Sequence, residues 1–222
     1  MRNCVLTVLG QKGAGKTTFA RWLLAQTPRA VVVDRFLEYE GAVTGSYDAA
    51  LDYLAANWRG SFRLVCRFTS DLYYREMFRF ITYTAEKAPT LPISLIVEEA
   101  DFFARTHYIE PSLHTAYNYG RHWDINLLSV ARVDTALHRD VIHCSDVLVV
   151  FRTRKFNSDM RELFTQEELQ RLVHLEQLTP GVAPVKGRHY LTYPADDDPV
   201  QMWLSCQVAP PAGALATPPR VG

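Results

Sequence analysis

The residues best suited to chemistry form a glycine-rich run directly after an apolar segment near the N-terminus, Cys4–Leu9. Glycines permit backbone angles closed to other residues, so successive N–H groups can turn inward around a phosphate chain. The Lys16 side chain can reach the β- and γ-phosphates, and the Thr17 hydroxyl can ligate Mg²⁺. A helix predicted over Thr17–Gln26 points its positive end at the same anion. The run therefore predicts a site for a nucleoside triphosphate. With the spacing G-x-x-x-x-G-K-T, its binding residues are Gly10, Gln11, Lys12, Gly13, Ala14, Gly15, Lys16, Thr17 and Thr18.

A second group of candidate residues is a pair of adjacent carboxylates at the end of another apolar segment. Ile93–Val97 is followed at once by Glu98 and Glu99. Ligands of α/β sheets bind at the C-terminal ends of strands, and successive strand side chains point to opposite faces. We therefore predict separate roles: Glu98 supports Mg²⁺ through water, and Glu99 is the base that activates the attacking water. Without the phosphate loop upstream, the same pair would indicate the acidic start of a helix.

The elements that must hold these residues are short apolar runs alternating with helical patterns. This alternation predicts parallel strands with right-handed crossovers, and hence an α/β fold: a three-layer αβα sandwich with a mostly parallel central sheet. The predicted strands are Cys4–Leu9, Ala30–Val33, Arg63–Phe68, Ile93–Val97, Ile125–Val130 and Val147–Phe151. The predicted helices are Thr17–Gln26, Tyr47–Asn57, Asp71–Ala88, Ser112–His122 and Leu137–His143.

The C-terminal third carries weaker signals. Ser158–Leu175 has helical periodicity, and Thr165 with Glu168 resembles a capping box that starts a second helix. Gly187–Tyr193 alternates like an exposed strand. From Pro194 the chain becomes rich in Asp, Pro and Ala, which predicts a flexible arm too poor in large apolar residues to pack. We therefore expect a P-loop ATPase domain over residues 1–193 and an arm over 194–222.

Composition places few limits on the partner. The 222 residues include 24 Lys and Arg and 24 Asp and Glu, so the chain is not a generally basic nucleic-acid binder. Its four cysteines are far apart, which favours reduced, mostly buried thiols over a disulfide framework. No signal peptide and no apolar run near the ~20 residues of a membrane span is visible. The sequence predicts a cytosolic protein.

These motifs resemble the FtsK–HerA superfamily of DNA-pumping ATPases over about residues 4–155. The phosphate loop, Val31–Asp34 with Glu38 and Tyr39, and the run Leu95–Asp101 (LIVEEAD) carry the resemblance. So do the run Gly120–Asp134 and the following strand Asp146–Phe151. The short chain is most similar to genome-packaging ATPases of membrane-containing icosahedral, tectivirus-like viruses. The resemblance implies a RecA/ASCE-like P-loop NTPase that uses ATP and Mg²⁺.

Two residues depart from the superfamily pattern. Glu98 stands where an Asp is usual, and its longer side chain can still reach a metal through water. Arg132 stands where the sensor is usually Gln. Because arginine cannot accept a hydrogen bond, Arg132 cannot orient a water as Gln does, although it could contact the γ-phosphate. The resemblance also implies an arginine finger supplied by a neighbouring subunit just before the fifth strand. Arg121 fits that place, with Arg132, Arg139 and Arg152 as competitors.

These features together predict an ATPase that translocates double-stranded DNA into a preformed viral capsid. It would form a homo-oligomeric ring, a pentamer or a hexamer, and meet capsid or membrane vertex proteins at the packaging vertex of the virion or in the host cytoplasm. Its catalytic residues would be Lys16, Glu98, Glu99 and Arg121. Arg152–Lys155, the densest basic cluster, could contact DNA phosphates or be solvated charge. A small-molecule P-loop kinase and a nucleotide-dependent assembly switch remain as alternatives.

Overall fold

An eight-stranded sheet forms the centre of the computed structural model, which describes residues 3–87, 92–132 and 137–207. The strand order is β10-β9-β1-β8-β5-β2-β4-β3, and every pairing is parallel except that of β10 with β9. The strands are β1 (Val5–Leu9), β2 (Arg29–Val33), β3 (Ala42–Thr44), β4 (Phe62–Cys66), β5 (Ile93–Val97), β8 (Ile125–Ala131), β9 (Val147–Phe151) and β10 (Tyr190–Tyr193).

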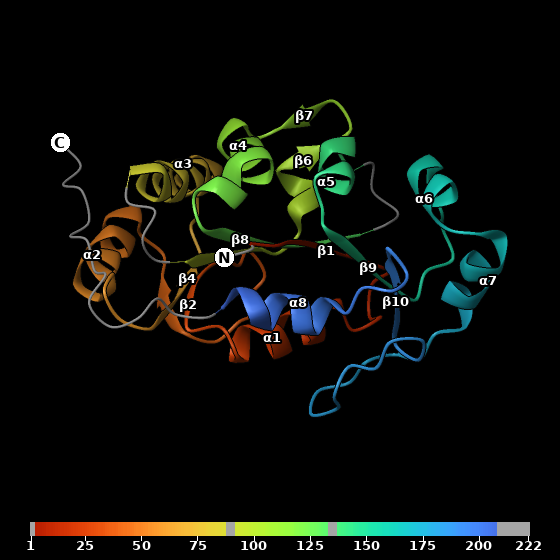
Figure 1. Cartoon of the computed structure of the whole chain (residues 1–222). Coiled ribbons are helices and arrows are strands. Elements are labelled where there is room, and N and C mark those ends of the chain that lie inside the picture. Colours follow the sequence, from red (N-terminus) through yellow and green to blue (C-terminus); the bar gives the residue numbers. More distant parts are fainter. Residues whose placement is uncertain (1–2, 88–91, 133–136, 208–222) are drawn as a thin grey trace.

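Helices cover both faces of this sheet (Figure 1). One face carries α1 (Lys16–Ala25) and α8 (Pro199–Cys206), which lie side by side. The other face carries α2 (Tyr47–Asn57), α3 (Asp71–Lys87), α4 (Pro111–Tyr119) and α5 (Arg139–His143). Two further helices, α6 (Ser158–Leu163) and α7 (Gln166–His174), lie beyond β9.

The two apolar layers follow from the alternation of strand side chains. Along β1, Val5 and Leu9 pack with the α2–α5 layer, whereas Leu6 and Val8 pack with α1 and α8. Since both faces are covered, all five residues of β1 are buried, which is why four of the five are apolar and only Thr7 is polar. The predicted three-layer αβα architecture is confirmed.

Most predicted elements are found within two residues of their expected ends, and β5, β9 and α2 have the bounds predicted. The capping box that starts α7 is present, with Thr165 and Glu168 exchanging hydrogen bonds. The last residue of the predicted third helix, Ala88, lies outside the described residues. Within the described part of the chain, no helix is both long and apolar enough to cross a membrane.

Several short elements were not predicted. These are β3, the 3-10 turn η1 (Ala100–Phe102), and a small hairpin of β6 (Ala104–Arg105) and β7 (Tyr108–Ile109), whereas the 3-10 turn η2 (Gly120–His122) is the end of the predicted helix Ser112–His122, which continues directly from α4. Each spans two or three residues, too few to show a periodic pattern. The prediction of an exposed strand at Gly187–Tyr193 is wrong in exposure: three of the four residues of β10 are buried, because the strand closes the sheet beside β9.

The domain continues past the boundary expected at residue 193. Asp198 caps α8, and the Trp203 side chain in that helix is fully buried. The indole Nε1 of Trp203 donates to Thr27 Oγ1 at 3.0 Å, which connects α8 to the chain two residues after the end of α1. A single tryptophan and its neighbours thus provide the apolar surface that the composition of the segment suggested was missing. The remainder of the expected arm, residues 208–222, lies outside the described residues.

Candidate nucleotide-binding and hydrolysis site

The glycine-rich run forms a tight loop that turns from β1 into α1. Gly13 has a φ of 76° and Gly15 a φ of 106°, in the left-handed region that side chains disfavour. Gly15 also packs against the segment after α7: a Cβ on Gly15 would lie 2.6 Å from the Leu178 carbonyl oxygen. The Leu178 amide in turn donates to the Ala14 carbonyl at 3.3 Å. The loop is therefore held from outside as well as by its own backbone.

Sheet order explains why the two motifs meet. β8 lies between β1 and β5 and is parallel to both, so the three C-terminal ends share one edge. The phosphate loop follows β1, the acidic pair follows β5, and Arg132 emerges between them after β8. A cavity of about 650 Å³ opens at this edge. It is lined by Lys12, Gly13, Gly15, Lys16, Thr17, Thr18, Phe36, Glu38, Glu98, Glu99, Val130, Ala131, Arg132, Gln177, Leu178 and Pro180.

Glu98 is buried against the start of α1. Its Oε1 accepts a hydrogen bond from Thr17 Oγ1 at 3.0 Å, and its Oε2 accepts a short one from the Tyr39 hydroxyl. Burial raises the pKa of Glu98 to about 7, although these two hydrogen bonds and the nearby Lys16 ammonium oppose the rise. Two hard oxygen donors, a hydroxyl and a carboxylate, stand 3.0 Å apart beside the phosphate loop, a set that suits Mg²⁺. The longer side chain of glutamate can thus bring its carboxylate beside Thr17, where a metal-supporting acid is expected.

A buried aspartate directly after β2, Asp34, positions Tyr39. Asp34 is fully buried and accepts hydrogen bonds from the backbone amides of Phe36, Glu38 and Tyr39. The Arg67 guanidinium pairs with the same carboxylate at 3.0 Å. This turn directs Tyr39 toward Glu98 and Phe36 toward the cavity. Asp34 and Tyr39 both belong to the motifs that carry the resemblance, but the sequence predicts no contact of either with Glu98.

Glu99 has a different environment from Glu98. Its backbone is left-handed, with a φ of 50° and a ψ of 52°, where β5 ends and η1 begins. This unusual conformation for a non-glycine residue leaves Glu99 in the cavity with 26% of its side chain exposed. Burial raises the pKa of Glu99, and the charge of Arg132 works against that rise. A half-buried carboxylate with a raised pKa is a suitable proton acceptor.

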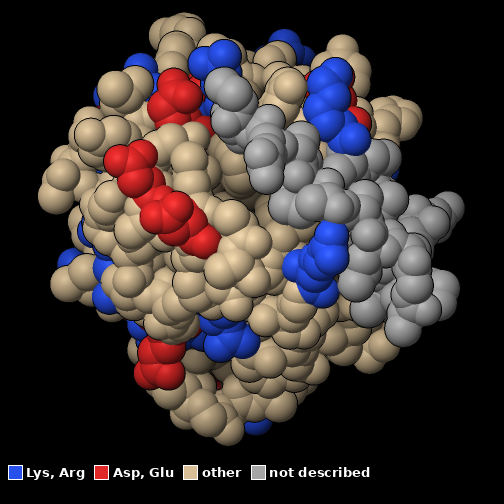
Figure 2. All heavy atoms as spheres, turned by 90° about the vertical axis from the view of Figure 1, so that its left-hand side faces the viewer, with Lys and Arg blue, Asp and Glu red and all other residues tan. Residues whose placement is uncertain are grey.

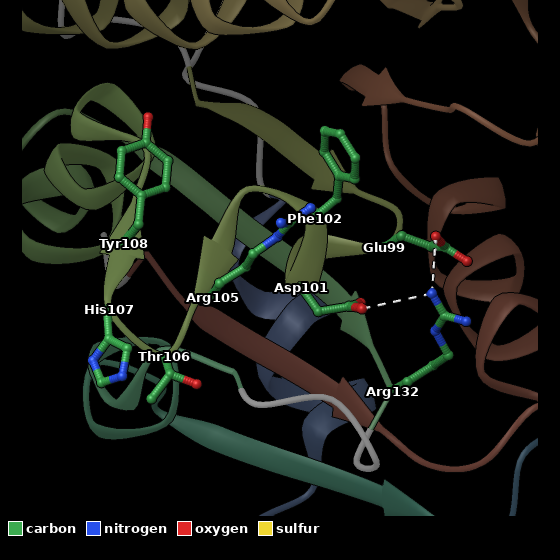
Figure 3. A pocket seen from close by; sticks show the side chains of 8 residues that line it. All are labelled: Glu99, Asp101, Phe102, Arg105, Thr106, His107, Tyr108 and Arg132. Carbon is green, nitrogen blue, oxygen red and sulfur yellow. Dashed lines mark hydrogen bonds and ion pairs between the residues drawn. The ribbon is translucent and has the colours of Figure 1, made fainter.

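Arg132 contacts two carboxylates on the turn that follows β5, those of Glu99 and Asp101. Its Nη2 lies 3.4 Å from Glu99 Oε2 and 3.7 Å from Asp101 Oδ2. Figure 3 shows this arrangement in a second cavity of about 650 Å³, adjacent to the first, with Glu99 and Arg132 in the wall between them. The η1 turn and the β6–β7 hairpin supply the other lining residues: Asp101, Phe102, Arg105, Thr106, His107 and Tyr108.

Arg121 is not part of this cavity. It lies in η2 before β8, at the N-terminal edge of the sheet, and pairs with Asp146 at 2.7 Å. β8 has seven residues, so about 20 Å of strand at roughly 3.3 Å per residue separates Arg121 from the site edge. Arg121 cannot serve the nucleotide site of its own chain.

The predicted site residues therefore divide into three groups. Lys12, Gly13, Gly15–Thr18, Glu98 and Glu99 line one cavity, as the two motifs predicted. Gly10, Gln11 and Ala14 belong to the loop without lining the cavity; the Gln11 carbonyl accepts a hydrogen bond from Lys16 Nζ at 3.1 Å. Arg121 lies at the opposite edge.

Comparison with solved structures finds the same fold in viral packaging enzymes. The genome packaging NTPase B204 from Sulfolobus turreted icosahedral virus 2, in complex with sulfate, is 18% identical with a TM-score of 0.60, covering 80% of this chain and 88% of that chain. Its complex with AMPPCP is 18% identical with a TM-score of 0.60, and the match covers 78% of this chain and 88% of that chain. B204, the DNA-packaging ATPase from Sulfolobus Turreted Icosahedral Virus, is 18% identical with a TM-score of 0.61, and the match covers 80% of this chain and 90% of that chain.

At this identity the likeness establishes the fold. No protein-family model and no curated protein matches the sequence. The P-loop ATPase fold predicted from the motifs is confirmed.

Proposed function

Starting from a chain with an FtsK–HerA-like P-loop ATPase fold, we propose that the protein hydrolyses ATP and uses the energy to move double-stranded DNA into a viral capsid. One observation carries the proposal. Residues from two distant motifs, Lys16 and Thr17 on one side and Glu98 and Glu99 on the other, line a single cavity. This is the set that phosphate binding, metal binding and water activation require.

Each residue has a role suited to its environment. Lys16 binds the β- and γ-phosphates, and Thr17 with Glu98 holds Mg²⁺, which when bound neutralises charge on the phosphate oxygens. Glu99, half-buried with a raised pKa, accepts the proton of the attacking water. The solved relatives in fold carry AMPPCP in one complex and ATP-γS in another, which supports ATP as the ligand here. A proton acceptor beside the phosphate loop favours hydrolysis over transfer to a second substrate.

The DNA-packaging role rests on the likeness to the B204 enzymes and on one basic segment. Arg154 and Lys155 are exposed just after β9, at the same sheet edge as the nucleotide site. The backbone joins the two places, since the Gln11 amide donates to the Arg152 carbonyl at 3.1 Å. By contrast, the side of the molecule drawn in Figure 2 carries Lys and Arg in small groups among acidic and uncharged residues. We propose the segment after β9 as a contact for DNA phosphates.

The proposed ring brings Arg121 to the site of the next subunit. Its position far from its own cavity fits a finger that acts between chains, once it leaves its pair with Asp146. The ring, pentameric or hexameric, would meet capsid or membrane vertex proteins at the packaging vertex, and would also be present in the host cytoplasm.

The decisive measurement is the rate of ATP hydrolysis with and without double-stranded DNA, with particle mass recorded alongside. We expect hydrolysis that DNA stimulates and that rises with protein concentration as rings form. Hydrolysis without stimulation would leave an ATPase but remove the translocase. Transfer of phosphate to a small molecule in place of water would favour a kinase.

The ring has its own test in a mixing experiment. Arg121→Ala should bind ATP like wild type and lose turnover by about 10³-fold or more, the scale measured for such fingers. Glu99→Gln should also be inactive. Mixed together, the two variants should regain part of the activity, because some interfaces join an intact base to an intact finger. Full activity of Arg121→Ala alone would refute Arg121 as the finger.

A further inference from the structure

Three side chains form a connected charged cluster (Figure 3): Glu99 and Arg132, which line both cavities, and Asp101, which lines the second. One nitrogen of Arg132, Nη2, lies near an oxygen of each carboxylate, at 3.4 Å and 3.7 Å. Glu99 and Asp101 are two residues apart on the turn from β5 into η1, where the Phe102 amide donates to the Glu99 carbonyl at 2.8 Å. The guanidinium therefore bridges two points of one tight turn.

Asp101 is the buried end of this cluster. Only 7% of Asp101 is exposed, and its Oδ1 has no hydrogen-bond partner among the described residues. A buried carboxylate oxygen without a donor is costly, and a cation within ion-pair distance of the same carboxylate offsets part of that cost. Arg132 is the cation in contact with it. Arg132 itself is 42% exposed on the cavity side.

The arginine cannot do what a glutamine would do at this place. It has donors only, so it cannot accept a hydrogen bond from the attacking water. What it contacts is the carboxylate that can. Glu99 has a long side chain with several rotamers, and fixing such a chain in one orientation is worth a large factor in rate, since a displacement of 1 Å can cost about 10²-fold.

We propose that Asp101 and Arg132 are positioning residues: buried Asp101 anchors Arg132, and anchored Arg132 holds the Glu99 carboxylate in the orientation that receives the proton from water. The inference rests on the proposed ATP hydrolysis. It replaces the water-orienting sensor with a device that orients the base. It also gives a role to Asp101, for which the sequence motif alone predicts none.

The test is a double-mutant cycle on the full chain, followed by ATP affinity and turnover. Arg132→Ala should lower kcat by about 10²-fold and Asp101→Ala by about 10-fold, each with ATP affinity within about 3-fold of wild type. Because Asp101 acts through Arg132, the variant with both changes should be no slower than Arg132→Ala alone. Arg132→Lys, which keeps the charge without the fork, should recover part of the loss.

Controls and contrary outcomes are separable. Asp52→Asn and Arg161→Ala remove exposed charges from α2 and α6 and should leave kcat unchanged. Thermal unfolding checks that each variant folds, and Asp101→Asn, which preserves shape, replaces Asp101→Ala if the latter does not. Multiplying effects in the double variant, or a loss confined to ATP affinity, would overturn the inference while leaving the ATPase intact. A wild-type protein without ATPase activity would overturn both.

Discussion

The raised pKa of Glu98 leads to a prediction about folding stability that can be tested without measuring ATP turnover. Burial raises its pKa from an ordinary 4.5 to about 7. Between these two values the folded chain binds a proton that the unfolded chain has released. Stability from this group is therefore full at low pH and is lost as the pH rises from about 4.5 to about 7. At 1.36 kcal/mol per pH unit, the total loss is roughly 3 kcal/mol.

Glu98→Gln removes this loss without removing the contacts. The amide oxygen can accept from the Tyr39 hydroxyl, and the amide nitrogen can donate to Thr17 Oγ1, which as a hydroxyl can also accept. In a metal-free buffer, the free energy of unfolding of the variant minus that of wild type should grow by roughly 3 kcal/mol between about pH 4.5 and about pH 7. Above about pH 7 the difference should stay constant.

The assay is urea unfolding of both proteins across this range in the presence of a chelator. Glu162→Gln removes one exposed carboxylate on α6 and controls for the change in net charge. Adding Mg²⁺ and a non-hydrolysable ATP analogue near pH 7 should stabilise wild type more than the variant, since the variant lacks the carboxylate that supports the metal. A difference that is independent of pH would refute the reasoning that Glu98 is ionised at a cost in this site.

Four further predictions concern the loop, the base and the domain boundary. Lys16→Ala should lose ATP affinity in a binding titration while its unfolding free energy stays within about 0.5 kcal/mol of wild type. Glu99→Gln should bind ATP normally and lose about 10²-fold or more in turnover, the scale of general-base loss; normal turnover would exclude Glu99 as the base. Gly15→Ala should cost more unfolding free energy than Gly13→Ala, because both have positive φ but only the former meets a backbone oxygen, at 2.6 Å. Trp203→Ala should destabilise the chain by about 3–5 kcal/mol in urea unfolding, whereas an unpacked arm would show no change.

The long elements could be predicted because burial on two faces leaves a strong pattern. β9 is an unbroken apolar pentamer and β5 is apolar apart from the buried Ser94, and the ends of both strands agree with the prediction to the residue. The capping box of α7 is a local motif whose partners lie three residues apart, so the chain specifies it without tertiary information. The phosphate loop was recognisable for the same reason, since all its residues are consecutive.

The predicted domain boundary at residue 193 is wrong, because the contact that extends the domain is not local in sequence. The segment after Pro194 is rich in Asp, Pro and Ala and has few large apolar residues, and such an average conceals one large residue that packs in the core. Trp203 buries its whole side chain beside α1 and finds a hydrogen-bond acceptor in Thr27, 176 positions earlier. A contact over that distance depends on where α1 and α8 lie on the sheet, which no local pattern contains.

The same argument explains which parts of the site were missed. Tyr39 reaches Glu98 only because Asp34 gathers three amides of one turn, and Arg132 reaches Asp101 only because β8 lies between β1 and β5. The motif residues are therefore the part of the site that is local in sequence, and the residues that orient them are the part set by strand order. A departure from a family pattern, such as Arg132 for Gln, cannot be interpreted within its own motif. Its role is explained by its ion pair with Asp101, which lies on the turn after the neighbouring strand β5. Arg132 and Asp101 should therefore be tested together.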